Sequence, residues 1–114
     1  MSTGIQSLVI PTTDADTAKA LITIVAGAEP HTDQPYYVGW NVNGLEVGLN
    51  PNGHAQGMTG PINYWQVDDV AKAQDALVEA SATAGQPATE VGGGTVVGTV
   101  TDSDGNVIGL IQRS

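Results

Sequence analysis

The chain has 114 residues, the length of one domain, and it is strongly acidic, because 12 acidic residues against three basic ones give a formal charge of −9. That charge argues against an electrostatic grip on nucleic acid or on an anionic membrane, so we expect neither as a partner. The lack of cysteine excludes disulfides, thiolate metal sites and a cysteine nucleophile.

The N-terminus has no basic and apolar leader, and no apolar run reaches the roughly 20 residues of a membrane span. These features predict a cytoplasmic protein.

The first half of the chain predicts a strand, a helix and a hairpin. Residues 5–12 have the apolar, β-branched content of a strand, and Asp14 is placed to cap a helix. One face of that helix is apolar at helical spacing, with Ala18, Leu21, Ile22 and Val25. Gly27 supplies its stop, and the loop 29–35 has room for a short strand. Residues 36–49 then read as two strands around an Asn-Gly turn.

The second half repeats this order after a connector. Glycine and proline are so frequent in residues 51–61 that we expect no regular structure there. A strand at 62–67 precedes a helix that Asp68 or Asp69 caps and Gly85 ends. Its apolar face holds Val70, Ala73, Leu77 and Ala80. A short strand near 89–91, a flexible link at 92–94 and a closing hairpin at 95–112 complete the chain.

The two halves align without a gap across their strand-to-helix junctions. Asp14, Ala18 and Ile22 fall on Asp69, Ala73 and Leu77. Each half therefore reads β-α-β-β-β, and because one such half cannot bury its sheet and helix alone, two must pair, within the chain or across a dimer. We predict an α+β protein with one domain, 1–114, made of module one (about 5–50), a connector (51–61) and module two (62–112).

The paired modules, the D-x-x-x-A helix starts and the closing Asp102-Ser-Asp-Gly-Asn106 turn before Ile108-Gly-Leu110 resemble the vicinal oxygen chelate superfamily. This superfamily contains glyoxalases, bleomycin-resistance proteins and extradiol dioxygenases. The resemblance covers the whole chain and departs at Ser103, where proline is usual. It implies a curved, partly open β-barrel with a concave cleft, commonly completed in a homodimer.

Metal-dependent members of that superfamily carry ligands on the first and last strand of each module. The resemblance places these positions at Ser7, Gly48, Ile62 and Gly109. Glycine and isoleucine have no donor side chain and a serine hydroxyl is a poor one, so we expect neither a metal site nor a cofactor.

Strand alternation, starting from those positions, sorts the side chains between the cleft and the helix-covered core. The predicted ligand-binding residues are Ser7, Val9, Tyr37, Asn41, Glu46, Ile62, Tyr64, Gln66, Gly109 and Ile111. Trp40 and Trp65 fall on the opposite face, where we expect core packing. Gly48 and Gly109 leave room for an aromatic-walled pocket beside Tyr37 and Tyr64.

No catalytic residue is identified, and three candidates stay open: Glu46, Tyr64 and His54. Glu46 is the acid on the cleft face, suited to proton transfer, or else an exposed hairpin residue. His54 lies in a connector that can act as a lid, and both His31 and His54 have the alternative of solvated loop residues.

Three functions remain open. The first is metal-independent binding of a small apolar or aromatic molecule between the modules, of the bleomycin-resistance kind. The second is a lyase, isomerase or other glyoxalase-family enzyme acting on a small metabolite. The third is a structural or regulatory protein with a vestigial cleft. The sequence names neither the ligand nor the pathway.

Overall fold

The computed structural model describes residues 4–113, which form two compact units. The N-terminal unit comprises residues 7–62, and the C-terminal unit comprises residues 63–113 together with 4–6. None of the helices in this described part of the chain is long and apolar enough to cross a membrane.

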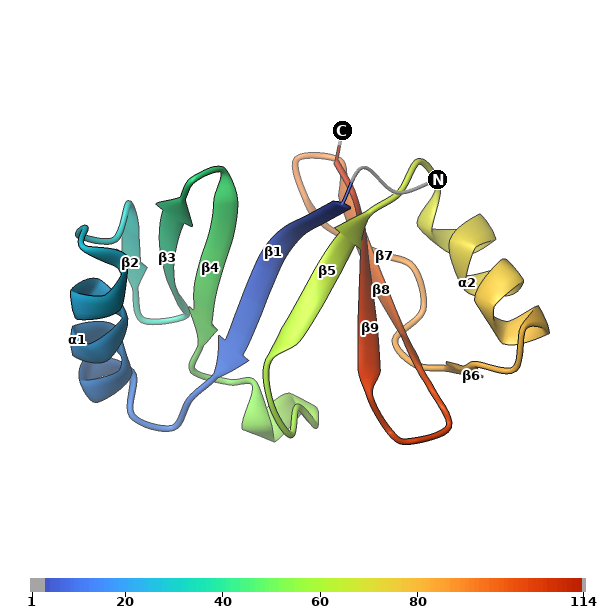
Figure 1. The fold of residues 1–114 in the computed structure, drawn as a ribbon, viewed down its shortest axis with the longest axis horizontal. Helices are drawn as coiled ribbons and strands as arrows, with labels where there is room; N and C mark the ends of the chain where they lie inside the picture. The colour runs from blue at the N-terminus through green and yellow to red at the C-terminus, as the bar shows by residue number, and fades with distance from the viewer. Residues whose placement is uncertain (1–3, 114) are drawn as a thin grey trace. The chain divides into compact units, whose positions relative to one another are not determined.

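The N-terminal unit follows the predicted β-α-β-β-β order (Figure 1). Its elements are β1 (Gly4–Pro11), α1 (Ala15–Ala26), β2 (Thr32–Gln34), β3 (Tyr37–Val42), β4 (Leu45–Asn50) and the short 3-10 helix η1 (His54–Gln56). The strands lie in the order β2-β3-β4-β1, with β1 parallel to β4 and the other pairs antiparallel. The turn between β3 and β4 has φ of 53° at Asn43 and 88° at Gly44, as an Asn-Gly hairpin requires.

Helix α1 begins and ends where the sequence predicts. The Asp14 carboxylate accepts the Thr17 backbone N–H at 3.1 Å, and Gly27 closes the helix in the left-handed conformation with φ of 68°. The residues of α1 that face the core differ from the predicted ones. Ala18, Ile22 and Ala26 pack on the core, whereas Leu21 and Val25 are exposed. The core-facing residues of this short helix are thus spaced four apart, whereas the predicted set mixes spacings of one, three and four.

The C-terminal unit repeats the arrangement with one more strand (Figure 1). Its elements are β5 (Ile62–Gln66), α2 (Val70–Glu79), β6 (Thr83–Ala84), β7 (Thr89–Gly92), β8 (Thr95–Thr101) and β9 (Val107–Gln112). The order is β5-β9-β8-β6, with β7 also pairing with β8. The predicted α+β class is confirmed, and the β-α-β-β-β order holds in the N-terminal unit, whereas the C-terminal unit adds the unpredicted strand β6. Among the described residues, the strands of neither unit close into a barrel.

Helix α2 ends six residues before the predicted stop at Gly85. Asp69 caps its start, since its carboxylate accepts the Lys72 backbone N–H at 3.1 Å. Its last residue is Glu79, and Ser81, with φ of 91°, makes the reversal for which glycine was expected. Gly85 instead lies against β8, where its N–H donates to the Thr99 carbonyl at 3.0 Å.

The connector 51–61 is more ordered than predicted, because it contains η1. The Asn50 side-chain amide donates to the Gln56 side-chain oxygen at 3.0 Å, and the Met58 N–H donates to the Gly53 carbonyl at 2.9 Å. Gly53 is buried against Pro11, which leaves no room for a side chain there. The expectation of no regular structure is therefore wrong for residues 54–56.

The two tryptophans have different environments. Trp40 is 1% exposed and lies with Val38 and Leu49 at the centre of the N-terminal core. Trp65 is 38% exposed, so the prediction that it packs in the core is wrong. The cause is the placement of α2, which packs chiefly against β8 rather than over β5.

Candidate functional site

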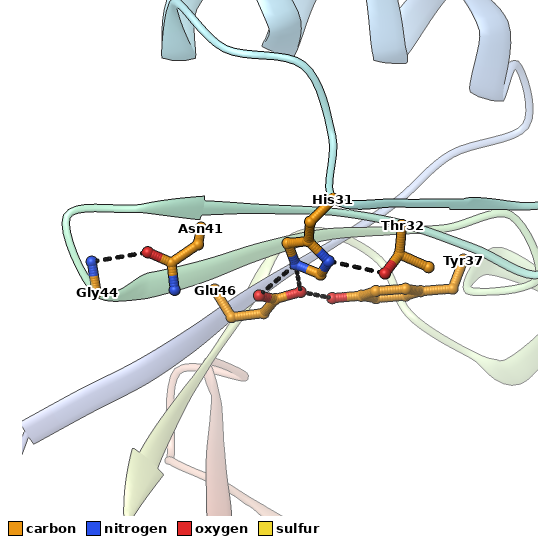
Figure 2. Close-up of polar contacts among 6 residues, drawn as sticks. All are labelled: His31, Thr32, Tyr37, Asn41, Gly44 and Glu46. Atoms are coloured by element: carbon orange, nitrogen blue, oxygen red, sulfur yellow. Dashed lines mark hydrogen bonds and ion pairs between the residues drawn. The ribbon is translucent and has the colours of Figure 1, made fainter.

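A cluster of polar side chains surrounds Glu46 on the β3–β4 hairpin (Figure 2). The Tyr37 hydroxyl donates to Glu46 Oε2 at 2.6 Å. His31 Nε2 lies 2.8 Å from Glu46 Oε1 and 2.9 Å from Oε2. On its other side, His31 Nδ1 lies 2.7 Å from Thr32 Oγ1. One carboxylate thus holds a phenol and an imidazole together.

Strand pairing brings these residues together from separate segments. Tyr37 begins β3, and Glu46 lies on β4 opposite Asn41 of β3 and Ser7 of β1. His31 precedes β2, and its backbone N–H donates to the Gly39 carbonyl at 2.8 Å. The hairpin and the short strand β2 therefore fix all three side chains of the cluster.

Two glycines make the space that the cluster occupies. A Cβ at Gly39 would lie 2.5 Å from Glu46 Oε2 and 2.6 Å from Tyr37 Cε2. A Cβ at Gly48 would overlap the Tyr37 ring in the same way. The ring of Tyr37 thus lies directly on Gly48 and next to Gly39. The room expected beside Tyr37 is filled by its own side chain.

The hydrogen bonds of His31 leave neither ring nitrogen free. In the neutral ring, Nε2–H donates to Glu46 and Nδ1 accepts from the Thr32 hydroxyl, and in the charged ring both nitrogens donate. His31 is 45% exposed and Glu46 23% exposed by side chain. The carboxylate is thus the more sheltered member of the pair. Because both of its ring nitrogens are engaged, His31 is better suited to hold Glu46 in place than to act as a general base.

The other predicted residues of the N-terminal unit lie around the cluster or apart from it. Ser7 is buried opposite Glu46, and Val9 pairs with Gly48. The Asn41 side-chain oxygen accepts the Gly44 N–H at 3.1 Å, so its amide supports the turn (Figure 2). His54 is exposed in η1 and makes no hydrogen bond to the cluster within the described chain.

The C-terminal unit has a matching tyrosine and glycine. Tyr64 pairs with Gly109, and a Cβ there would lie 2.7 Å from Tyr64 Cδ1, so this ring also covers a glycine. Burial raises the pKa of the Tyr64 phenol. Gln66 lies two residues on, and its buried Oε1 has no hydrogen-bond partner in the described structure. Ile111, opposite Gln66, is buried, as is Ile62 at the start of β5.

The residues present do not fit the metal site that the fold family implies. Of the four positions, Gly48 and Gly109 are covered by tyrosine rings, and Ile62 has no donor. Ser7 is buried in β1 and supplies only a hydroxyl. Within residues 4–113, no group of three or more His, Asp or Glu side chains gathers where a metal ion could bind.

His31 is the member of the cluster that the sequence did not reveal. Strand alternation assigns faces only inside a strand, and His31 lies one residue before β2. The glycine at position 39 is the signal that was available, because a glycine in the middle of a strand often marks a close approach.

Comparison with protein-family models gives no match, and comparison with curated protein sequences gives none. Solved structures do match. A glyoxalase/bleomycin resistance protein/dioxygenase superfamily member from Vibrio splendidus is 16% identical, with a TM-score of 0.71 over 96% of this chain and 99% of that one. A variant of Streptomyces coelicolor methylmalonyl-CoA epimerase, in complex with 2-nitronate-propionyl-CoA, is 14% identical, with a TM-score of 0.72 over 100% of this chain and 99% of that one.

A third structure is the Mn(II)-bound glyoxalase from Novosphingobium aromaticivorans. It is 18% identical, with a TM-score of 0.67, and the match covers 97% of this chain and 39% of that one. At such identities the likeness establishes the fold and leaves the activity open. The repeated order of elements in the two units and these matches together show that the chain has the vicinal oxygen chelate fold of the glyoxalase/bleomycin resistance/dioxygenase proteins.

Proposed function

We propose that the protein binds a small apolar or aromatic molecule without a metal, in the manner of a bleomycin-resistance protein. One observation carries the proposal. At Gly48 and Gly109, where metal-dependent relatives would carry a ligand, the surface is the ring of Tyr37 or Tyr64. An aromatic ring offers a flat apolar surface to a ligand and no donor of the kind that metals prefer.

The polar cluster supplies the orienting contacts in this proposal. Glu46 and His31 are both partly exposed, so a ligand amine or hydroxyl can reach them. The charge of −9 favours a neutral or cationic ligand over an anionic one. The epimerase from Streptomyces was solved with a coenzyme A derivative, whose phosphates this acidic chain would repel. Aromatic amines are therefore the first class to test.

A thermal-shift screen of neutral and cationic aromatic compounds, run on untagged protein with and without EDTA, tests the proposal. A ligand at 100 times its dissociation constant should stabilise the fold by about 2.7 kcal/mol, and EDTA should not change that shift. Metal analysis of the same protein is the second measurement. Stoichiometric nickel, zinc, manganese or iron, or a shift that EDTA abolishes, would contradict metal independence.

Tyrosine variants provide the matched control. Tyr37→Leu and Tyr64→Leu should each weaken ligand binding, because each removes the ring that we propose as the ligand contact in its own unit. Tyr36→Leu should not, since Tyr36 is 66% exposed at the turn that precedes β3. Equal effects of all three changes would argue against the tyrosine surface. A screen with no ligand at all would favour a structural or regulatory protein with a vestigial site.

An enzyme is the second candidate, and the hydrogen bonds of Glu46 are the observation that favours it. Its carboxylate lies between a phenol and an imidazole, each of which can carry a proton. A lyase or isomerase that moves a proton on a small metabolite would use Glu46 as base, with Tyr64 and His54 as the further candidates. Glu46→Gln should then abolish turnover, and full activity in this variant would exclude Glu46 from the mechanism.

We also propose that the protein is cytoplasmic and that it forms a homodimer; the resemblance to its fold family supports the dimer. Sedimentation equilibrium at micromolar concentration should give twice the chain mass. A monomer at all concentrations would contradict it.

A further inference from the structure

A groove of about 530 Å³ lies in the C-terminal unit between α2 and the strands β5 and β9. Trp65 of β5, Val67 directly after β5 and Leu110 of β9 line it on the sheet side. Ala73, Ala76 and Leu77 line it on the helix side. The groove is separate from the proposed tyrosine surface, because Tyr64 alternates with Trp65 along β5 and so faces the other side of the sheet.

The groove exists because the two units fill the space under their helices differently. In the N-terminal unit, Val47 and Leu49 of β4 pair with Trp40 and Val38 of β3. The corresponding residues of β9, Ile108 and Leu110, pair with Val100 and Gly98 of β8. Val100 thus stands in the C-terminal unit where Trp40 stands in the N-terminal unit, and Gly98 stands where Val38 does. The C-terminal unit lacks the bulk that fills the N-terminal core.

The missing side chain at Gly98 also moves the helix to one side. A Cβ at this position would lie 2.9 Å from Val70 Cγ1 and 2.8 Å from Gln74 Nε2, so α2 sits close to β8 here. Gln74 Nε2 donates to the Gln86 carbonyl at 2.6 Å and to the Thr99 carbonyl at 3.1 Å, which fixes the helix in that place. The flank over β5 stays uncovered, and Trp65 remains 38% exposed.

We propose that this groove is a second binding site, for a neutral aromatic molecule of two or three rings. Its volume falls in the range of roughly 300–1,000 Å³ that small-molecule sites occupy. None of its lining side chains carries a charge, although the chain has a net charge of −9, and Asn63 and Asn106 are its polar members. A charged ligand would lose its hydration there without gaining an ion pair. Trp65 provides the ring on which the ligand stacks.

Titration with N-phenyl-1-naphthylamine, a neutral aromatic amine whose emission rises in apolar surroundings, tests the proposal. Binding should saturate at one probe per chain in this site. Ala76→Leu puts an isobutyl group into the groove and should weaken probe binding at least about tenfold. Ala71→Leu is the matched control, because Ala71 is exposed on the same helix and does not line the groove. It should change the affinity by less than about twofold.

A second readout does not depend on any variant. In the wild-type protein, the indole N–H resonance of Trp65 should shift on probe binding, while that of the buried Trp40 should stay in place. Equal affinities of the Ala76 and Ala71 variants, an unmoved Trp65 resonance or the lack of saturable binding would each overturn the proposal.

The two proposed sites can fail independently. Tyr37→Leu and Glu46→Gln lie outside the groove and should leave the affinity for the probe within about twofold of wild type. If these variants lose the probe and Ala76→Leu keeps it, the probe binds at the tyrosine surface. That result would overturn the groove as a site and support the proposed function.

Discussion

Gly39 and Gly48 provide the space in which the side chains of the candidate site lie. Each lies in the middle of a strand, where a glycine costs stability unless something needs the space. Here the Tyr37 ring needs it, because its path to Glu46 crosses both glycines. The site therefore depends on two residues that contribute no functional group.

Gly39→Ala should displace Tyr37 or Glu46, since its methyl group would lie 2.5 Å from Glu46 Oε2. We expect a loss of about 1–3 kcal/mol in the free energy of unfolding, the usual cost of overpacking. Urea denaturation measures it. Gly60→Ala is the control, because a methyl group there meets nothing within 4 Å and the backbone needs no left-handed conformation. Equal stability of the two variants would contradict this account of the site.

The half-buried phenol of Tyr64 should ionise at a higher pH than a free tyrosine does. Burial raises its pKa above the usual value of 10.0, because the phenolate would lose hydration. The folded state then favours the neutral phenol, so its contribution to stability is complete at lower pH and is lost as pH rises through the raised pKa. Tyr64→Phe should remove one high-pH step from an ultraviolet titration and should make stability less sensitive to alkali. Removal of a step below pH 10 would contradict it.

Sequence patterns predicted part of this site and could not predict the rest. Alternation put Tyr37 and Glu46 on one face, and they form a hydrogen bond. The contact with His31 could not be predicted in that way, because a bend before β2 sets the direction of its side chain. Trp65 was misplaced for a different reason. Its burial depends on where α2 lies, and Gly98 on another strand decides that.

At the scale of elements, the closing hairpin lies where the sequence predicts it, and the hydrogen bonds of its turn explain why. Asp102 Oδ1 accepts the backbone N–H groups of Asp104 at 2.9 Å and Asn106 at 2.8 Å, and Asn106 Nδ2 donates to Asp102 Oδ2 at 3.0 Å. Gly105 takes the left-handed conformation with φ of 86°. All of these contacts lie within residues 102–106, so the sequence of these five residues is enough to predict the turn.

The hydrogen bonds of this turn predict a response to acid. The side-chain amide of Asn106, followed by its backbone N–H, lowers the pKa of Asp102 from the usual value of 3.8. A group with a lowered pKa stabilises the folded state above its unfolded pKa, and that contribution is lost as pH falls through the folded value. Asp102→Asn should therefore lower stability at neutral pH and flatten its decline below about pH 4. An unchanged acid profile would contradict this role.

The ends of the helices were predictable to different degrees. Both starts have an aspartate cap that the sequence shows directly, Asp14 and Asp69. The end of α1 follows from Gly27, but α2 ends at Glu79 with Ser81 in the left-handed region. Gly85 has the residue type that commonly ends a helix, but its backbone N–H pairs with Thr99 of β8 instead. Local signals decide a helix end only where no strand competes for the same residue.

At the scale of the whole molecule, the helix of each unit contributes few buried residues. Helix α1 has no buried residue, and Leu21, Ile24 and Val25 on its surface are exposed. In α2 only Val70 is buried among its described residues. A domain of roughly 60 residues buries a smaller fraction of its surface on folding than a larger domain does, and it is correspondingly marginal in stability. These features favour one cooperative domain over two independent ones.

Each unit carries one of the two tryptophans, so its unfolding can be followed separately: Trp40 reports on the N-terminal unit and Trp65 on the C-terminal unit. With both labelled as 5-fluorotryptophan, fluorine NMR in increasing urea should show the two native signals disappearing together. We expect equal midpoints, because a unit of about 60 residues buries too little surface to be stable when it folds alone. Distinct midpoints would show instead that residues 1–114 form two domains, and the single-domain proposal would then fail.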